Sequence, residues 1–103
     1  MAIVNQRAFD GALKVLQEDE ALRQEDISWE CVGGQVRDEV HTLTEPELHT
    51  IAHQTNPPKL KLGIRASMRG CHKQLTRATA LFLWRYCQIR SENGRDSSPP
   101  ATS

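Results

Sequence analysis

Large aromatic side chains are scarce in this 103-residue chain, and long apolar runs are absent. Aromatic residues make up 5% of the sequence, so the core has to be built mainly from aliphatic side chains. The longest apolar run covers five residues, Ala80 to Trp84, whereas a membrane-spanning helix needs roughly 20. The first residues also lack the apolar stretch of a secretory signal. These absences predict one small cytoplasmic domain without a membrane partner.

Cysteine is also sparse, and its pattern excludes two kinds of site. The chain has three cysteines, Cys31, Cys71 and Cys87. Their number is odd, their spacing is wide and no Cys-x-x-Cys pair occurs, so neither a disulfide framework nor a thiolate zinc site is indicated. A glycine-rich phosphate loop is missing as well, because the pair at positions 33 and 34 lacks the Gly-Lys pattern and a preceding strand.

Residues with the spacing of a catalytic site are missing too. Cys71 and His72 are adjacent, and neighbours on a helix point about 100° apart, so they cannot form a nucleophile–base pair. His49 and His53 have a chelating spacing, but the metalloprotease glutamate is absent and a third ligand would have to come from elsewhere. Two exposed histidines beside a buried stripe are the simpler interpretation. We therefore predict no enzyme activity, metal, cofactor or small-molecule substrate.

The chain instead has a strong segregation of charge, which its formal net charge of zero conceals. Residues 1–58 contain eleven acidic and four basic residues, a net of −7. Residues 59–103 contain nine basic and two acidic residues, a net of +7. Such an asymmetry favours a polyanionic or acidic partner for one of the two halves.

The first half of the chain has the periodicity of helices. Apolar residues recur every three or four positions over 4–23, which predicts an amphipathic helix there. A similar pattern continues over 27–43, but Gly33 and Gly34 interrupt it, and glycine in a helix interior costs on the order of 1 kcal/mol. We therefore predict a turn ending at Gly34 and a helix over 35–42. The Thr-Glu-Pro-Glu sequence at 44–47 is a capping box that starts a helix over 44–56, which Pro57 ends.

The second half predicts one strand and one long helix. Residues 59–65 alternate between apolar and basic or glycine positions, as in a half-buried strand. Because no other segment alternates as cleanly, the strand is expected to pair with its own copy in a second subunit or with a strand of another protein. The last helix, over 68–91, has an apolar surface wider than one stripe, which is typical of a central or interface helix.

The predicted fold class is therefore mainly α, with four or so helices and one isolated short strand used in dimer pairing. A single helical domain spans residues 1–91, and residues 92–103 form a polar tail that we expect to be disordered. The residues assigned to subunit contacts are Leu60, Leu62, Ile64, Leu81, Phe82, Trp84 and Tyr86.

Four cations of the second half are spaced four residues apart: Arg65, Arg69, Lys73 and Arg77. In a helix this spacing lines side chains along one side. Such a ridge can follow a phosphate backbone, and each phosphate contact releases counterions. The alternative is a solvated face whose charges pair with the acidic half of the same molecule or of its neighbour.

Residues 43–56, Leu-Thr-Glu-Pro-Glu-Leu-His-Thr-Ile-Ala-His-Gln-Thr-Asn, followed by the predicted strand, resemble the middle of FlhD-like proteins. These proteins are the small subunits of the flagellar master transcription activator, with relatives on conjugative plasmids and integrative elements. The shared pattern is a Leu-Thr-x-Pro helix start, an apolar helix ending near Asn and an alternating strand before a helical C-terminal part. The resemblance implies a mostly helical dimer that joins a larger, zinc-binding FlhC-like partner to activate transcription.

Two functions follow from these observations. The first is a small transcription regulator that dimerises and contacts DNA through its basic C-terminal half, within a hetero-oligomeric activator complex. The alternative is a non-enzymatic inhibitor or adaptor of the phage or plasmid type. In that case the acidic first half would imitate a nucleic acid and occupy a basic groove of another protein.

Overall fold

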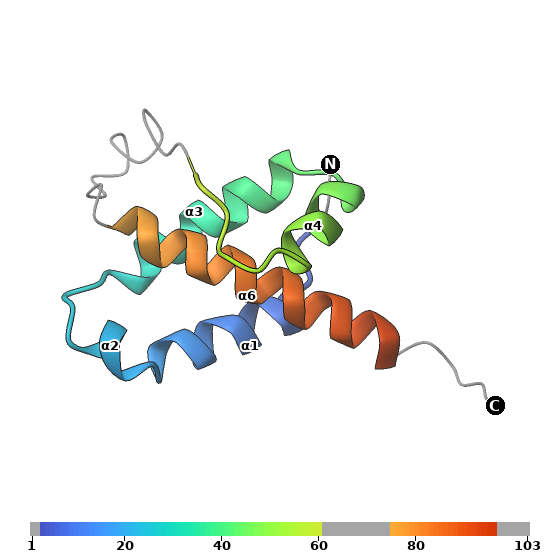
Figure 1. Cartoon of the computed structure of the whole chain (residues 1–103). Coiled ribbons are helices and arrows are strands. Elements are labelled where there is room, and N and C mark those ends of the chain that lie inside the picture. The colour runs from blue at the N-terminus through green and yellow to red at the C-terminus, as the bar shows by residue number, and fades with distance from the viewer. Residues whose placement is uncertain (1–2, 61–74, 97–103) are drawn as a thin grey trace.

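The computed structural model describes residues 3–60 and 75–96, and every regular element within these ranges is a helix (Figure 1). The helices are α1 (Gln6–Gln17), α2 (Glu20–Arg23), α3 (Trp29–Thr42), α4 (Glu45–Ala52) and α6 (Leu75–Asp96). The predicted mainly helical fold is therefore confirmed. In the described part of the chain, no helix combines the length and the apolar character that crossing a membrane requires.

Helix α6 lies at the centre of the fold, and α1, α3 and α4 all pack against it (Figure 1). Its wide apolar surface explains this position, because one helix that contacts three others needs apolar residues around much of its circumference. The buried apolar residues of α6 are Ala78, Ala80, Phe82, Leu83, Tyr86 and Cys87. The sequence predicted either a central or an interface helix, and the centre is where the described structure places it.

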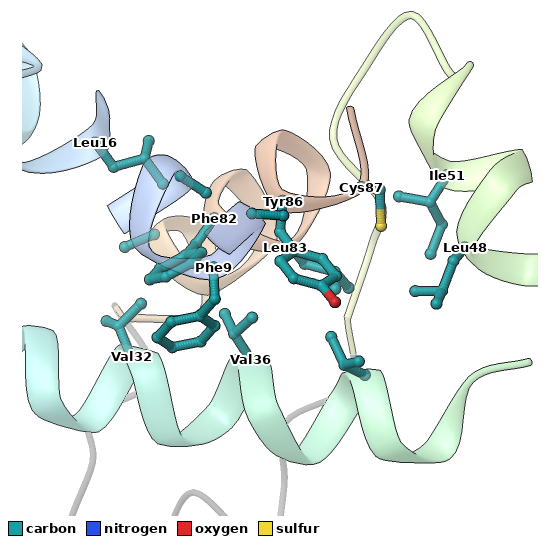
Figure 2. Packing of buried hydrophobic residues seen from close by; sticks show 14 of the residues in the cluster. Phe9, Leu16, Val32, Val36, Leu48, Ile51, Phe82, Leu83, Tyr86 and Cys87 are labelled. Atoms are coloured by element: carbon teal, nitrogen blue, oxygen red, sulfur yellow. The ribbon is translucent and has the colours of Figure 1, made fainter. Parts of the chain in front are cut away.

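Two phenylalanines form the aromatic part of the core (Figure 2). The rings of Phe9 in α1 and Phe82 in α6 have centroids 4.9 Å apart and are tilted by 43°. Val32 and Val36 of α3 lie beside the Phe9 ring in Figure 2. The guanidinium carbon of Arg37 lies 4.0 Å from the Phe9 centroid, a cation–π contact that adds to the apolar packing. Both phenylalanines thus lie where three helices meet.

Helix α3 runs without interruption through both glycines, so the predicted turn ending at Gly34 is wrong. Gly33 is buried, and a Cβ atom at this position would lie 3.4 Å from Cζ of Phe9. The Phe9 ring therefore packs against α3 at Gly33, at the lower limit of ordinary van der Waals contact for a Cβ atom. We attribute the unbroken helix to this packing, which offsets a propensity cost of about 1 kcal/mol.

The predicted helix over 4–23 is divided into α1 and α2 by a cap at Asp19. The Asp19 carboxylate accepts a hydrogen bond from the Leu22 amide at 3.2 Å. In the same way, the side chain of Asn5 caps α1 by accepting from the Ala8 amide at 3.1 Å. Short polar side chains at such positions compete with continuation of a helix. The apolar stripe nevertheless carries through the break, because Leu22 is also buried.

A buried polar pair joins α3 to α6. The Thr79 hydroxyl donates a hydrogen bond of 2.6 Å to Oε1 of Gln35. Both residues are almost completely buried, and the Gln35 amide nitrogen donates to none of the residues in the described ranges. Such pairs favour one arrangement of two helices over a slipped one, because any other register would leave both groups unpaired.

The cysteines differ from the sequence-based expectation. Cys31, half-buried in α3, is disulfide-bonded, although the odd number and wide spacing predicted no disulfide framework. Spacing could not indicate this bond, because a disulfide depends on proximity in space. Cys87 is a free thiol in the core, 2% exposed.

Other element boundaries differ from those predicted for residues 44–103. The strand predicted over 59–65 lies mostly outside the described residues. Its first two positions, Lys59 and Leu60, are described and belong to no strand, and Leu60 packs against the core of its own chain. Helix α4 ends at Ala52, before the predicted end at residue 56. Helix α6 continues to Asp96, so residues 92–96 are helical, whereas we predicted a disordered tail from 92; residues 97–103 lie outside the described ranges.

Substituting alanine at Gly11 should stabilise the fold. Gly11 lies within α1, and a Cβ atom there would make ordinary contacts of 3.5 and 3.8 Å with Ile89 of α6. Because alanine loses less backbone entropy than glycine on helix formation, we expect Gly11→Ala to raise the free energy of unfolding by about 0.5–1 kcal/mol. Urea denaturation followed by tryptophan fluorescence measures the change. A lower midpoint would show that α1 and α6 lie too close for a methyl group.

Candidate nucleic-acid interface

Of the four residues of the predicted basic ridge, Arg77 is described. Arg65, Arg69 and Lys73 lie outside the described residues. Arg77 lies near the start of α6, and its side chain is 69% exposed. One guanidinium nitrogen lies 3.8 Å from a carboxylate oxygen of Glu25, which is itself half-exposed. Exposed ion pairs of this length contribute little to stability. The Arg77 guanidinium therefore remains accessible to a partner.

Arg90 is bound into the fold much more firmly. Its guanidinium donates to both carboxylate oxygens of Glu45 at the start of α4. The Arg90 side chain is 26% exposed, and a contact with two oxygens fixes the geometry better than a single contact does. This pair joins α4 to α6, so Arg90 serves the fold and is withdrawn from external partners.

Tyr86 extends this junction to the start of α1. The Tyr86 hydroxyl accepts a hydrogen bond of 2.9 Å from the Asn5 backbone amide. Burial raises the pKa of Tyr86, and the Asn5 hydrogen bond and the nearby Arg90 charge oppose that shift. Tyr86 and Phe82 are both 0% exposed within one chain. Their predicted place in a subunit interface is therefore corrected to the intrachain core, because neither side chain reaches the surface.

Of the other predicted interface residues, three lie at the edge of the core and two lie outside the described residues. Leu60, Leu81 and Trp84 are half-buried at the edge of the core, whereas Leu62 and Ile64 lie outside the described residues. The Trp84 indole N–H donates a 3.2 Å hydrogen bond to the Gln54 carbonyl. This bond holds the segment that follows α4 against α6, as its path in Figure 1 also shows.

A shallow groove lies beside this segment. One part, about 350 Å³ in volume, lies between the end of α4 and α6 and is lined by Ala52, His53, Arg85, Gln88, Ser91 and Glu92. A second part of about 630 Å³ is lined by every residue from His53 to Lys59. His53 lines both hollows, so they adjoin, and we treat the two together as one groove. We call it the α4–α6 groove.

Four cations that follow Pro58 have described side chains, and the fold divides them into two pairs. Arg77 and Arg90 form ion pairs with carboxylates of the first half, Glu25 and Glu45. Lys59 and Arg85 are exposed and form no ion pair with any residue in the described ranges. These two unpaired cations both line the α4–α6 groove. The groove therefore contains Lys59 and Arg85, the two of these four cations that form no ion pair with a described residue.

His53, the residue that follows α4, lines this groove, and His49 lies one turn earlier in α4. His49 and His53 are exposed, and their rings meet edge to face with centroids 4.3 Å apart. Among the residues that the structure describes, no group of three or more metal-ligating side chains is arranged to hold an ion. Both imidazoles are therefore presented to solvent, and His53 shares the lining of the groove with Arg85 and Lys59.

Comparison with known proteins adds no assignment, because no protein-family model, curated protein or solved structure matches this chain. Sequence reasoning placed Lys59 in a strand and left Arg85 unassigned. Lys59 does not follow the four-residue spacing of the ridge, and Arg85 follows it only beyond a gap at Leu81, so the ridge was assigned to end at Arg77. Arg85 follows Trp84 in α6. The hydrogen bond from Trp84 to Gln54 brings this part of α6 beside the segment after α4. This contact joins residues 30 positions apart, so no local pattern could indicate the groove.

Proposed function

We propose that this chain is a small non-enzymatic transcription regulator that binds the phosphate backbone of DNA through its C-terminal half. It acts as a dimer within a hetero-oligomeric activator complex, as the resemblance to FlhD-like proteins implies. The observation that carries the proposal is the exposure of Arg77, Arg85 and Lys59, because guanidinium and ammonium groups at the surface are the usual phosphate contacts. The proposal is also supported by the charge balance, because residues 59–103 carry a net charge of +7 and residues 1–58 a net charge of −7.

Phosphate contacts position a protein on DNA but carry no sequence information. The chain alone should therefore bind duplexes of different sequence with similar affinity. Sequence discrimination would come from the partner subunit of the complex.

Removing the charge of Arg77 should weaken DNA binding. We expect Arg77→Gln to lower the affinity for a fluorescently labelled duplex of arbitrary sequence by roughly threefold to tenfold at low salt, since one phosphate contact is lost. Fluorescence anisotropy measures the affinity, and light scattering on the same sample should give twice the mass of one chain. Lys14→Gln is the matched control, because Lys14 is an exposed cation on α1. Equal losses in both variants, or no binding by the unmodified chain, would contradict the proposal.

A second function is supported by the acidic surface around α2. Six carboxylates in this short region are exposed: Glu18, Asp19, Glu20, Glu25, Asp26 and Glu30. Such a surface suits an adaptor that covers the basic groove of another protein. The same titration separates the two functions: an adaptor would leave the duplex unbound and would bind a basic nucleic-acid-binding protein instead.

A further inference from the structure

We infer that the DNA backbone lies in the α4–α6 groove, with Arg85 and Lys59 as phosphate contacts in its two parts. This inference rests on the proposed function and names the surface that performs it. It differs from the predicted ridge, of which Arg77 is the described member. Arg85 is two helical turns beyond Arg77 on α6, about 12 Å at 1.5 Å per residue.

The first support is the distribution of ion pairs. Arg90 is held by both oxygens of Glu45, and Arg77 has Glu25 nearby. An external phosphate would have to compete with these carboxylates. Lys59 and Arg85 form no ion pair with any described residue, so a phosphate does not have to displace a bound carboxylate from them. The groove is therefore where an anion meets the least resistance on this side of the molecule.

The second support is the chemistry of the lining. Besides the two cations, the lining includes side chains with N–H or O–H donors, which are Gln54, Thr55, Asn56, Gln88 and Ser91. Phosphate oxygens only accept hydrogen bonds, and most protein contacts to the DNA backbone come from donors of these types. Glu92 is the carboxylate in the lining, and it should repel the backbone at its end of the groove.

The third support is that both walls are fixed before any ligand arrives. The Trp84–Gln54 hydrogen bond holds the segment after α4 against α6. Pro57 and Pro58 are half-buried and restrict its backbone, and the half-buried Leu60 packs against the core beyond them. A surface that is already ordered does not lose additional entropy when it binds. Lys59 and Arg85 are thus presented on fixed backbone.

The test is the double variant Lys59→Gln/Arg85→Gln in the full chain, with labelled duplex DNA of arbitrary sequence. Two lost phosphate contacts should reduce the slope of log affinity against log salt by about 2. The matched control is Arg7→Gln/Lys14→Gln, which removes two exposed cations of α1 that do not line the groove. Its slope should remain within about 0.5 of the unmodified chain. Circular dichroism melting of both variants checks that the fold is kept.

A second variant tests the groove by a gain of binding. Glu92→Gln removes the repelling carboxylate and should strengthen DNA binding about twofold to threefold at low salt. An unchanged affinity for Glu92→Gln, or equal slopes for the two double variants, would overturn the groove. In either case DNA binding by the unmodified chain would still support the proposed function. If the unmodified chain binds no duplex, both the proposed function and the groove assignment fail.

Discussion

Replacing Phe82 with alanine is expected to lower the free energy of unfolding by about 3–5 kcal/mol. Phe82 is 0% exposed, and its ring meets that of Phe9 at a centroid distance of 4.9 Å. Alanine would leave a cavity at the junction of α1, α3 and α6, which can relax only partly because all three helices are held by other contacts (Figure 2). A domain of this size is stable by about 5–15 kcal/mol. The variant should therefore be close to unfolding at ambient temperature.

Urea denaturation monitored by circular dichroism measures this loss, with Leu81→Ala as the matched control on the same helix. Leu81 is half-buried, so its truncation should cost about 1 kcal/mol. The comparison also tests the correction of Phe82 from a subunit interface to the intrachain core. If Phe82→Ala dissociates a dimer and leaves the monomer as stable as before, the core assignment is wrong.

At alkaline pH the fold is expected to lose stability, because Cys87 has to remain protonated inside it. Burial raises the pKa of the Cys87 thiol from 9.0 to about 12, and the nearby charge of Arg90 opposes this shift. In the unfolded chain the thiol ionises near pH 9, so its contribution to stability is complete below that pH and is lost as pH rises toward 12. Three pKa units correspond to about 4 kcal/mol. Tyr86 acts in the same direction, because burial raises its pKa as well.

The free energy of unfolding measured by urea between about pH 8 and pH 11 tests this expectation. Cys87→Ala removes the ionisable group, so its stability should fall less steeply with pH than that of the unmodified chain. The slopes are the relevant quantity, because the substitution also leaves a small cavity at every pH. Equal slopes for both proteins would contradict the expectation, as would rapid alkylation of Cys87 in the folded protein at pH 8.

The sequence predicts those parts of the fold that depend on near neighbours. The helix start at 44–47 is one example: the Thr44 amide and hydroxyl both donate to a carboxylate oxygen of Glu47, each at 2.9 Å. These hydrogen bonds lower the pKa of Glu47. All the atoms involved belong to residues three positions apart, so the motif and its geometry could be inferred together.

Features that depend on distant residues could not be predicted in the same way. We attribute the continuity of α3 to tertiary packing such as that of Phe9 over Gly33. The wide apolar surface of α6 left open whether its covering helices belong to the same chain or to a partner, and for Phe82 and Tyr86 they belong to the same chain. In each case the deciding contact joins segments that are far apart in sequence.

The same limit applies to the candidate site. The cations of the site could be counted from the sequence. Whether each of them can bind a phosphate depends on the carboxylates that lie near it in the folded chain. The pair between Arg90 and Glu45 spans 45 residues, and it removes one cation that composition alone would assign to DNA. Conversely, Lys59 and Arg85 gain importance because no described carboxylate pairs with them. Charge segregation therefore indicates which half of the chain we propose to bind DNA, and tertiary pairing indicates which of its described cations form no ion pair.

The central claim is that cations of the C-terminal half left accessible by the fold contact DNA phosphates. The most direct test is the affinity of the unmodified chain for duplex DNA between about 50 and 200 mM salt. Three contacts per chain, from Lys59, Arg77 and Arg85, predict a slope of about −3 in log affinity against log salt for each chain that contacts the duplex, and of about −5 for a dimer that binds with both chains. A slope near zero, or no measurable binding at the lowest salt, would contradict the claim.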